Sequence, residues 1–534
     1  MKKLLSLVLM AALLLSCVAF TASAEATEAV ISYSITDDPQ QMDPTLNSYA
    51  RSSVVLQNLF VGLYKLGPDG ETYIPACATD YTVSDDGLTY TFTIREGLKW
   101  SDGTDLNAND FEYSWKRVLD PELASPTCSD LWVIENGKEY SNGECSADEV
   151  GVKALDDYTL EVKLDYLAPW FPSLTATTCY FPVQKATVEA NENWTASVDT
   201  YVSNGPFKLV EYSSLDKLVY EKNEYYFDAE NVQIDKVIYY IIADSTAELT
   251  AYEQGTLNVM DDLDASSRDK YGATDEYYMQ SKVGIQYWDF NCQLPEFADN
   301  RVRKAFAMAI PRQTVLDACQ LTAEQPVYGF IPTSQPSLTG GESYRADTGD
   351  LFTEDQEAAK ALFDEATAGA DYMVDGKFPT VKIVCQNSDE QKTAAQVLGD
   401  IWASVLGIEY EIWTPEQGYW DELANGNFSV GRNGYTCDYL DPSANLKIWV
   451  TGSNCSENGW DDPVYDEMVN AASQIVDGAE REAALQEAEA YLVDQMPGMP
   501  MYTMVDDYLV KSNVKGVIKN KIGHIFFEYA TIEG

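Results

Sequence analysis

Apolar and polar residues alternate in short segments of the first half of the chain. In residues 90–94, tyrosine, phenylalanine and isoleucine are interleaved with threonine, and Asp86-Gly87 lies just upstream. Residues 160–164 show the same alternation with leucine and valine. A period of two predicts strands with one buried face, and Asp-Gly predicts a hairpin turn. The continuous apolar run 237–242 predicts a strand that is buried on both faces.

Helical spacing becomes frequent further along the chain. Apolar residues recur every three or four positions in 302–310, 358–366 and 481–492. In the second of these segments the predicted buried stripe is Ala358, Ala361, Leu362 and Ala366. Ser245-Thr246-Ala247-Glu248 reads as a capping box that opens another helix. Because strand and helix patterns are mixed throughout, the sequence predicts layered α/β structure.

Charge restricts the classes of function. The 534 residues include 35 Lys and Arg against 86 Asp and Glu, which gives a formal net charge of −51. Nucleic-acid binding needs a basic surface, so we expect no nucleic-acid partner. His524 is the single histidine, which argues against His-based catalysis and against a multi-His metal site. We therefore expect no metal and no cofactor.

The N-terminus predicts export, by one of two routes. Lys2 and Lys3 precede an apolar run over 4–15, which is too short to span a membrane. Ala22-Ser23-Ala24 then offers a cleavage site, with residues 1–24 as a signal peptide. Alternatively, Leu14-Leu15-Ser16-Cys17 resembles a lipobox, which makes Cys17 a site of lipidation. Both routes predict an extracytoplasmic protein, in the periplasm or at the cell surface.

Cysteine pairing stays open at this stage. Without Cys17, nine of the ten cysteines remain, so at least one has no intramolecular partner. Cys128 with Cys145 and Cys437 with Cys455 are candidate disulfides, whereas buried free thiols are the simpler interpretation.

Two long motifs stand out in the first half of the chain: residues 86–103, DGLTYTFTIREGLKWSDG, and residues 109–126, NDFEYSWKRVLDPELASP. Both resemble the family 5 extracellular solute-binding proteins, in particular their oligopeptide-binding branch. Shorter matches follow in the expected order along nearly the whole mature chain: Met42-Asp43-Pro44, Ser203-Asn204-Gly205-Pro206-Phe207, Asn300-Arg301-Val302-Arg303-Lys304-Ala305 and Phe526-Phe527-Glu528-Tyr529-Ala530.

The resemblance implies an α/β, periplasmic-binding-protein-like (cluster C) fold with two lobes, an extra inserted domain and a central ligand cleft. Turn clusters at 67–70, at 203–206 and near Ser281 are candidate boundaries. The expected division is domain I at 25–70, 200–282 and 505–534, a domain II insertion at 71–199, and domain III at 283–504.

The resemblance also implies a ligand site around residues 431–442, GRNGYTCDYLDP. At the position of Asp438, the oligopeptide binders place an aspartate that pairs with the ligand's α-ammonium; a turn residue before Pro442 is the alternative interpretation. Arg432 suits a ligand carboxylate, or a structural ion pair. The other expected site residues are Asn433, Tyr435, Gln386, Asn387, Gln391, Asn47 and Ser48.

Three positions depart from the family's pattern. Tyr435 and Glu416 stand where tryptophans are usual, and Gln391 stands where histidine is found in well-studied members. These departures leave the length and sequence preference of the ligand open.

The function implied is that of the substrate-binding component of an ABC importer, a monomer that captures short peptides and delivers them to permease subunits driven by separate ATPases. A receptor of the same fold for another solute, such as an oligosaccharide, is the first alternative, because 11 Trp and 35 Tyr could stack on sugars. A secreted acidic hydrolase is a remote alternative, because acidic pairs alone have little specificity. An amine ligand needs Asp438, whereas a neutral sugar does not.

Overall fold

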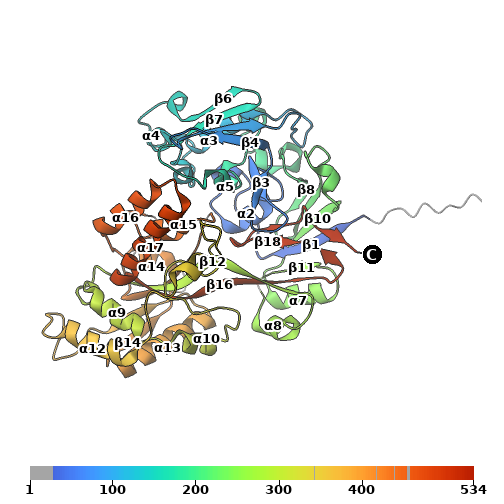
Figure 1. The fold of residues 1–534 in the computed structure, drawn as a ribbon. Helices are drawn as coiled ribbons and strands as arrows, with labels where there is room; N and C mark the ends of the chain where they lie inside the picture. Colours follow the sequence, from blue (N-terminus) through green and yellow to red (C-terminus); the bar gives the residue numbers. More distant parts are fainter. Residues whose placement is uncertain are drawn as a thin grey trace, which may run out of the picture.

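The computed structural model describes residues 28–261, 263–341, 343–415, 418–437, 439–453 and 458–533. Within these residues, three sheets of four or more strands organise the chain. In Figure 1 the insertion sheet is at the top, the sheet with the N-terminal strand is at the right, and the helix-rich part is at the lower left. The predicted mixture of strands and helices is therefore confirmed.

The first sheet joins the N-terminal strand to strands that follow much later in the chain. Its order is β1-β10-β9-β8, formed by β1 (Val30–Ile35), β10 (Lys236–Ile241), β9 (Lys217–Lys222) and β8 (Phe207–Ser213). β1 runs parallel to β10, and the other pairs are antiparallel. The strand predicted at 237–242 is confirmed, but burial on both faces is wrong. Val237 and Tyr239 are buried, whereas Ile238 and Tyr240 are half-buried, because only a small cluster beside α7 covers their face.

The second sheet belongs to the insertion between β3 and β8. It has the antiparallel order β4-β5-β7-β6, formed by β4 (Ala78–Val83), β5 (Thr89–Ile94), β7 (Thr159–Lys163) and β6 (Val152–Asp156). The predicted alternation is confirmed, because Tyr90, Phe92 and Ile94 are all buried. Gly87 lies in the β4–β5 turn with a φ of +74°, a conformation that disfavours other residues.

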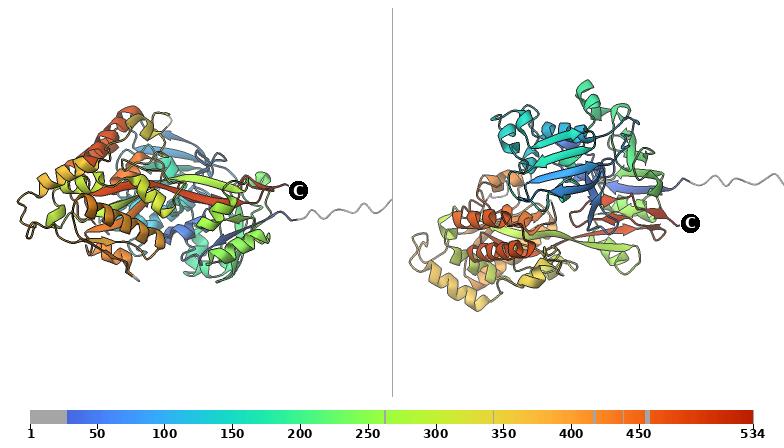
Figure 2. Two further views of the ribbon diagram at one scale, coloured as in Figure 1. Left: turned by 90° about the horizontal axis from the view of Figure 1, so that it is seen from below. Right: turned by 45° about the horizontal axis from the view of Figure 1, so that its top comes forward.

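The third sheet is the largest and runs between the two halves of the molecule. Its order is β11-β16-β12-β15-β13-β14, formed by β11 (Val259–Met260), β16 (Gly498–Val510), β12 (Tyr277–Phe290), β15 (Val430–Thr436), β13 (Val381–Val384) and β14 (Tyr410–Trp413). The long strands β12 and β16 extend from the helix-rich part to the first sheet (Figures 1 and 2). Their pairing shifts register between Ser281 and Ile285.

Short hairpins and helices complete the fold. The two-stranded pairs are β2 (Tyr64–Leu66) with β3 (Tyr73–Pro75), β17 (Val514–Lys515) with β20 (Thr531–Ile532), and β18 (Ile518–Lys519) with β19 (Ile525–Phe526). The helices are α2 (Ala50–Leu56), α3 (Ala108–Val118), α4 (Gly137–Ser141), α5 (Phe171–Leu174), α6 (Lys185–Ala190), α7 (Ser245–Glu253), α8 (Ala265–Tyr271), α9 (Asn300–Met308), α10 (Arg312–Cys319), α11 (Tyr344–Thr348), α12 (Gln356–Thr367), α13 (Asp389–Val405), α14 (Tyr419–Ala424), α15 (Pro442–Lys447), α16 (Pro463–Ser473) and α17 (Gly478–Gln495).

Two helix details differ from the sequence prediction. α12 forms as predicted, but its buried face is Ala359, Phe363 and Thr367, because the large Phe363 sets the face turned to the core. α7 is capped one residue early, by the side chain of Asp244, which accepts a hydrogen bond from the N–H of Ala247. Asp is as good an N-cap as Ser, so sequence propensity did not distinguish the two positions.

Most buried apolar side chains belong to one of two large clusters. The first core joins the first sheet to the insertion, with Tyr239, Phe92 and Trp115 among its members. The second core fills the helix-rich part around Phe306 and Trp402. No helix among the described residues combines the length and the apolar character that crossing a bilayer requires.

The candidate disulfide between Cys128 and Cys145 is wrong. Both are free thiols, α4 fills the segment between them, and Cys145 Sγ lies 3.8 Å from the carbonyl oxygen of Asn136. Cys455 and Cys17 lie outside the described residues, so the second candidate pair and the lipidation site stay predictions.

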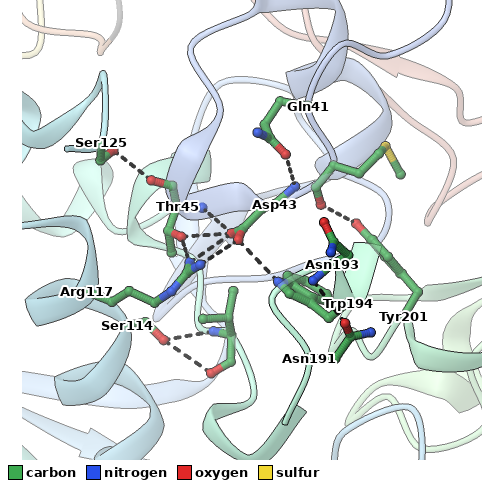
Figure 3. Close-up of polar contacts among 12 residues, drawn as sticks. Gln41, Asp43, Thr45, Ser114, Arg117, Ser125, Asn191, Asn193, Trp194 and Tyr201 are labelled. Carbon is green, nitrogen blue, oxygen red and sulfur yellow. Dashed lines mark hydrogen bonds and ion pairs between the residues drawn. The ribbon is translucent and has the colours of Figure 1, made fainter. Parts of the chain in front are cut away.

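A buried polar network fixes the 41–47 segment on the insertion (Figure 3). Arg117 of α3 donates to both carboxylate oxygens of Asp43, at 3.1 and 2.8 Å, and also to the hydroxyl of Thr45. Trp194 Nε1 donates to the same carboxylate at 3.2 Å, and the hydroxyl of Tyr201 donates to the carbonyl of Met42 at 2.8 Å. The Asp43 carboxylate is therefore buried with its charge balanced by Arg117 and with hydrogen-bond donors on both of its oxygens.

Replacement of Arg117 by Met should destabilise the protein strongly. It leaves the Asp43 carboxylate, 5% exposed, without its cation, which costs about 3 kcal/mol of unfolding free energy. Lys185→Met is the control, because the Lys185–Glu189 pair is exposed and contributes less than about 1 kcal/mol. Urea unfolding followed by circular dichroism measures both. Equal losses for the two variants would contradict a structural role for the network.

Candidate functional site

The strand that carries the predicted site residues passes from one core toward the other. Val430 is buried in the second core, and Tyr435, five residues later on β15, packs against both cores. Cys437 and Tyr439 are buried in the first core. The end of β15 therefore lies at the junction between the two halves of the molecule.

β15 has one paired edge and one edge that is largely open. Its whole length pairs with β12, whereas β13 pairs with it only at Val430 and Gly431. The N–H of Cys437 donates to the carbonyl of Val283 at 2.9 Å, which fixes the phase of the antiparallel ladder. By the alternation of such ladders, the peptide groups of Arg432, Gly434 and Thr436 point to the other edge. Two of these groups already have partners, because the hydroxyl of Tyr419 donates to the carbonyl of Arg432 and the N–H of Gly434 donates to Asn433 Oδ1 at 2.8 Å. No strand of the described residues pairs with this part of β15, so the carbonyl of Gly434 and the peptide groups of Thr436 are placed to pair with an extended chain.

Arg432 is a half-buried cation at this edge. Within the described part of the chain, no carboxylate lies within 4 Å of its guanidinium. Burial raises the pKa of Tyr502, and the nearby Arg432 opposes that rise. Burial likewise raises the pKa of Cys385 to about 11, again opposed by Arg432. In so acidic a chain, an arginine without an ion-pair partner is suited to a carboxylate brought by a ligand.

The side chain of Asn433 points to the opposite face of the strand. It is buried, and its Nδ2 donates to Asp289 Oδ2 at 2.8 Å. Asn458 donates to the other oxygen of the same carboxylate at 3.1 Å. The structure thus places Asn433 in a buried polar cluster with Asp289 and Asn458.

The predicted loop after β13 is held by hydrogen bonds between two of its own residues, Gln386 and Gln391. Gln391 Nε2 donates to Gln386 Oε1 at 2.9 Å, and the N–H of Gln386 donates back to Gln391 Oε1 at 2.9 Å. Gln391 is buried at the start of α13, whereas Asn387 is exposed. The reciprocal pair orders the loop, and Asn387 is the member of the set that is open to solvent.

The early-loop residues lie just before α2. Asn47 is buried, its Nδ2 donates to Ser53 Oγ at 2.9 Å, and its Oδ1 accepts from the N–H of Tyr49 at 3.0 Å. Ser48 is exposed. Asn47 therefore shapes this loop, and Ser48 presents a hydroxyl to solvent.

Asp438 and Glu416 lie outside the described residues. The neighbours of position 438 in the sequence, Cys437 and Tyr439, are described and buried. Asp441, three residues further on, is the N-cap of α15 and binds Arg481 through two hydrogen bonds of 2.7 Å.

Sequence reasoning missed a contact between the two halves that involves Trp170. The ring of Trp170, from the insertion, stacks on the ring of Tyr439, and the guanidinium of Arg481 lies over it (centroid distances 5.8 and 4.3 Å). The sequence did show a tryptophan in the Pro-rich segment 168–172, APWFP. A pattern within one segment does not reveal which distant residue that tryptophan contacts.

Comparison with known proteins places this geometry in a family. Residues 72–457 match the bacterial extracellular solute-binding proteins, family 5. The chain belongs to this family. The dipeptide-binding protein DppE of Bacillus subtilis is 31% identical over 497 residues, which cover 92% of this chain and 90% of DppE.

Further relatives share the fold and differ in the solute that they are named for. The structure of the Escherichia coli murein tripeptide-binding protein MppA superposes with a TM-score of 0.79 at 29% identity, covering 95% of this chain and 99% of MppA. The probable deoxycholate-binding protein YgiS of Escherichia coli is 29% identical over 506 residues, covering 92% of this chain and 91% of YgiS. The predicted two-lobed fold is confirmed, and members of the family bind solutes in the periplasm or outside the cell.

For a solute-binding protein, this arrangement offers directional recognition. The open edge of β15 supplies backbone hydrogen bonds, Arg432 supplies a positive charge at one end, and position 438 follows the other end. Four residue steps of β15 separate Arg432 from Thr436, where the strand ends, a distance of about 13 Å. A linear solute with a negative charge at one end fits such an edge.

Replacement of Asn433 by Ala should affect stability. The carboxylate of Asp289, 1% exposed, loses a hydrogen-bond donor, so we expect a loss of about 1–3 kcal/mol. The control Asn387→Ala removes an exposed amide and should change stability by less than about 0.5 kcal/mol. Thermal and urea unfolding measure both. An unchanged stability combined with weaker solute binding would instead identify Asn433 as a ligand residue.

Proposed function

We propose that this chain is the extracytoplasmic receptor of an ABC importer and that it captures short peptides between its lobes. The observation that carries the proposal is the open edge of β15 at the junction of the two cores, flanked by an arginine that forms no ion pair with any described carboxylate. Peptide-binding relatives that cover nearly the whole chain support the same ligand class.

The peptide binds as an added strand. Its backbone pairs with the outward carbonyl of Gly434 and with the peptide groups of Thr436, which recognises features that all peptides share. Asp438 binds the α-ammonium group, and Arg432 binds the terminal carboxylate. With its ends in these positions the peptide runs antiparallel to β15, and the span accommodates up to about six residues.

Lobe closure follows from the energetics of the charged ends. Domain I (25–70, 200–282 and 505–534), with the domain II insertion (71–199), closes against domain III (283–504) around the ligand. A charge that is buried without its partner is costly, so the ligand's ammonium and carboxylate groups favour closure. The closed monomer then docks on membrane permease subunits, whose separate ATPases drive uptake. No reaction step is required of this chain.

Export precedes this role. Cleavage after Ala24 releases a soluble receptor, whereas processing before Cys17 gives a receptor that is anchored by a lipid. Either product works outside the cytoplasm, where the family acts.

The test is native mass spectrometry of the gently purified mature protein, followed by fragmentation of any released solute. Bound masses that fragment as short peptides support the proposal and give their length distribution. A bound sterol-like molecule, as the name of YgiS suggests for that relative, or a bound oligosaccharide would overturn the peptide assignment. The same spectrum reports whether the chain begins at Glu25 or at a lipidated Cys17.

Asp438→Asn should weaken peptide binding strongly. It removes the charge that pairs with the ammonium group in a desolvated site, a loss of about 2–5 kcal/mol in binding free energy. Isothermal titration calorimetry measures the affinity, and Asp371→Asn, an exposed acid elsewhere in domain III, is the control. N-acetylation of the peptide should weaken binding to the wild type but add little to the variant. Equal sensitivity of the two proteins to acetylation would refute this assignment.

Arg432→Gln should weaken binding of peptides with a free carboxylate about tenfold, which corresponds to about 1.4 kcal/mol. A peptide with a C-terminal amide should bind the wild type and the variant equally, because it brings no charge for Arg432. The control Arg301→Gln alters an arginine that is already paired with Asp299 and Glu365 on the surface. If the amide discriminates between wild type and variant as strongly as the free acid does, Arg432 does not read the carboxylate.

A further inference from the structure

Trp170 is one of the residues through which the insertion contacts the segment after β15. It precedes α5 in the insertion and is half-buried. Its ring lies nearly parallel to that of Tyr439, with an interplanar angle of 3° and 5.8 Å between centroids. Tyr439 and Trp170 belong to opposite lobes of the proposed closure, so the stack exists only when those lobes are together.

Arg481 adds a second contact to the same ring. Its guanidinium carbon lies 4.3 Å from the Trp170 centroid, within the range of a cation–π interaction. Arg481 comes from α17 and is 2% exposed, and its two terminal nitrogens bind Asp441. Its Nε is buried and has no hydrogen-bond partner among the described residues, so the aromatic face is a principal partner for the rest of the guanidinium.

Tyr439 and Asp441 are therefore held from two sides. Asp441 caps α15 by accepting from the N–H of Ser443 at 2.9 Å and is fixed by Arg481, while Tyr439 rests on Trp170. Upstream, Cys437 is tied to Val283 by a backbone hydrogen bond. Position 438 lies between these anchors, so anything that moves Trp170 also acts on the loop that carries Asp438.

We propose that Trp170 is the closure latch of this protein: its contact with Tyr439 and Arg481 holds the insertion against the 437–441 loop and thereby sets how long a bound peptide stays enclosed. Trp170 is a positioning residue, which acts on the ligand through the loop. That Trp170 holds the lobes together is argued from its contacts with Tyr439 and Arg481. The effect on the residence time of a bound peptide rests on the proposed function.

The surroundings of the latch favour a closed state that is stable yet reversible. Lys447 Nζ lies 4.6 Å from the Tyr439 centroid, so Tyr439 also takes part in a cation–π contact. Tyr166 of the insertion lies close to Tyr439, and burial raises its pKa to about 12, so its hydroxyl stays neutral at physiological pH. Aromatic and cation–π contacts contribute modestly each, which allows the lobes to separate again.

The first test uses ligand-free protein and small-angle X-ray scattering. Trp170→Ala should shift the population to an open form with a larger radius of gyration, whereas Trp170→Phe, which keeps an aromatic ring, should remain close to the wild type. Trp132→Ala is the matched control, because Trp132 is also a half-buried tryptophan of the insertion with a lysine over its ring, but that lysine, Lys138, belongs to the same domain. Thermal unfolding confirms that each variant is folded.

The second test measures peptide dissociation by stopped flow with a fluorescent peptide. Trp170→Ala should release the peptide about tenfold faster, with the association rate little changed, and Trp170→Phe should largely restore the slow release. Scattering and release identical to those of Trp132→Ala would overturn the latch. If no peptide binds even to the wild type, the proposed function fails, whereas the scattering comparison still decides whether Trp170 holds the lobes together.

Discussion

Two long antiparallel strands, β12 and β16, carry the chain between its two hydrophobic cores, and the rest of the structure depends on them. Their ladder is interrupted between Ser281 and Ile285, where they pass from one core to the other. At this interruption the C-terminal segment takes the place of β16 as hydrogen-bond partner, because the N–H of Val283 donates to the carbonyl of Lys521 at 2.8 Å. The ion pair of Lys282 with Asp506, at 3.4 Å, lies at the same place. A pair of strands that runs through both halves, with its ladder interrupted between them, is the type of element that allows two lobes to move while they stay connected.

The candidate site lies where this crossing leaves an unpaired edge. β15 borders β12 along its whole length, but β13 follows it only at the first two residues, so the remaining edge opens at the junction of the cores. The candidate site therefore needs no separate scaffold, because the strand that is part of the large sheet also has backbone groups at its open edge. Arg432 stands out there because, in a chain with a net charge of −51, it forms no ion pair with any described carboxylate. The same negative charge would favour the approach of positively charged solutes, most strongly at low salt.

Local patterns predicted local structure well, and they failed where a choice depended on distant residues. The alternation at 90–94 gave the correct strand and the correct buried face, because one face of β5 meets the core. In α12 the periodicity identified the helix but not its face, which Phe363 determines by packing against Phe306 and Phe378. The candidate pair Cys128 and Cys145 was close in sequence, but α4 occupies the segment between them. The motif around Asn433 likewise did not reveal that its Nδ2 donates to Asp289, which is 144 residues away in the chain, while its role in ligand binding stays a prediction.

The sequence by itself determined most of the strands and helices and the family, and it indicated the segment that is proposed as the site. Those conclusions need only local periodicity and long motifs, each of which is a property of neighbouring residues. Only the tertiary structure decided which side chains of that segment face the open edge, and which residue of the insertion meets Tyr439 and Arg481. These outcomes depend on strand register and on contacts between residues far apart in the chain, and a one-dimensional pattern carries no information about either.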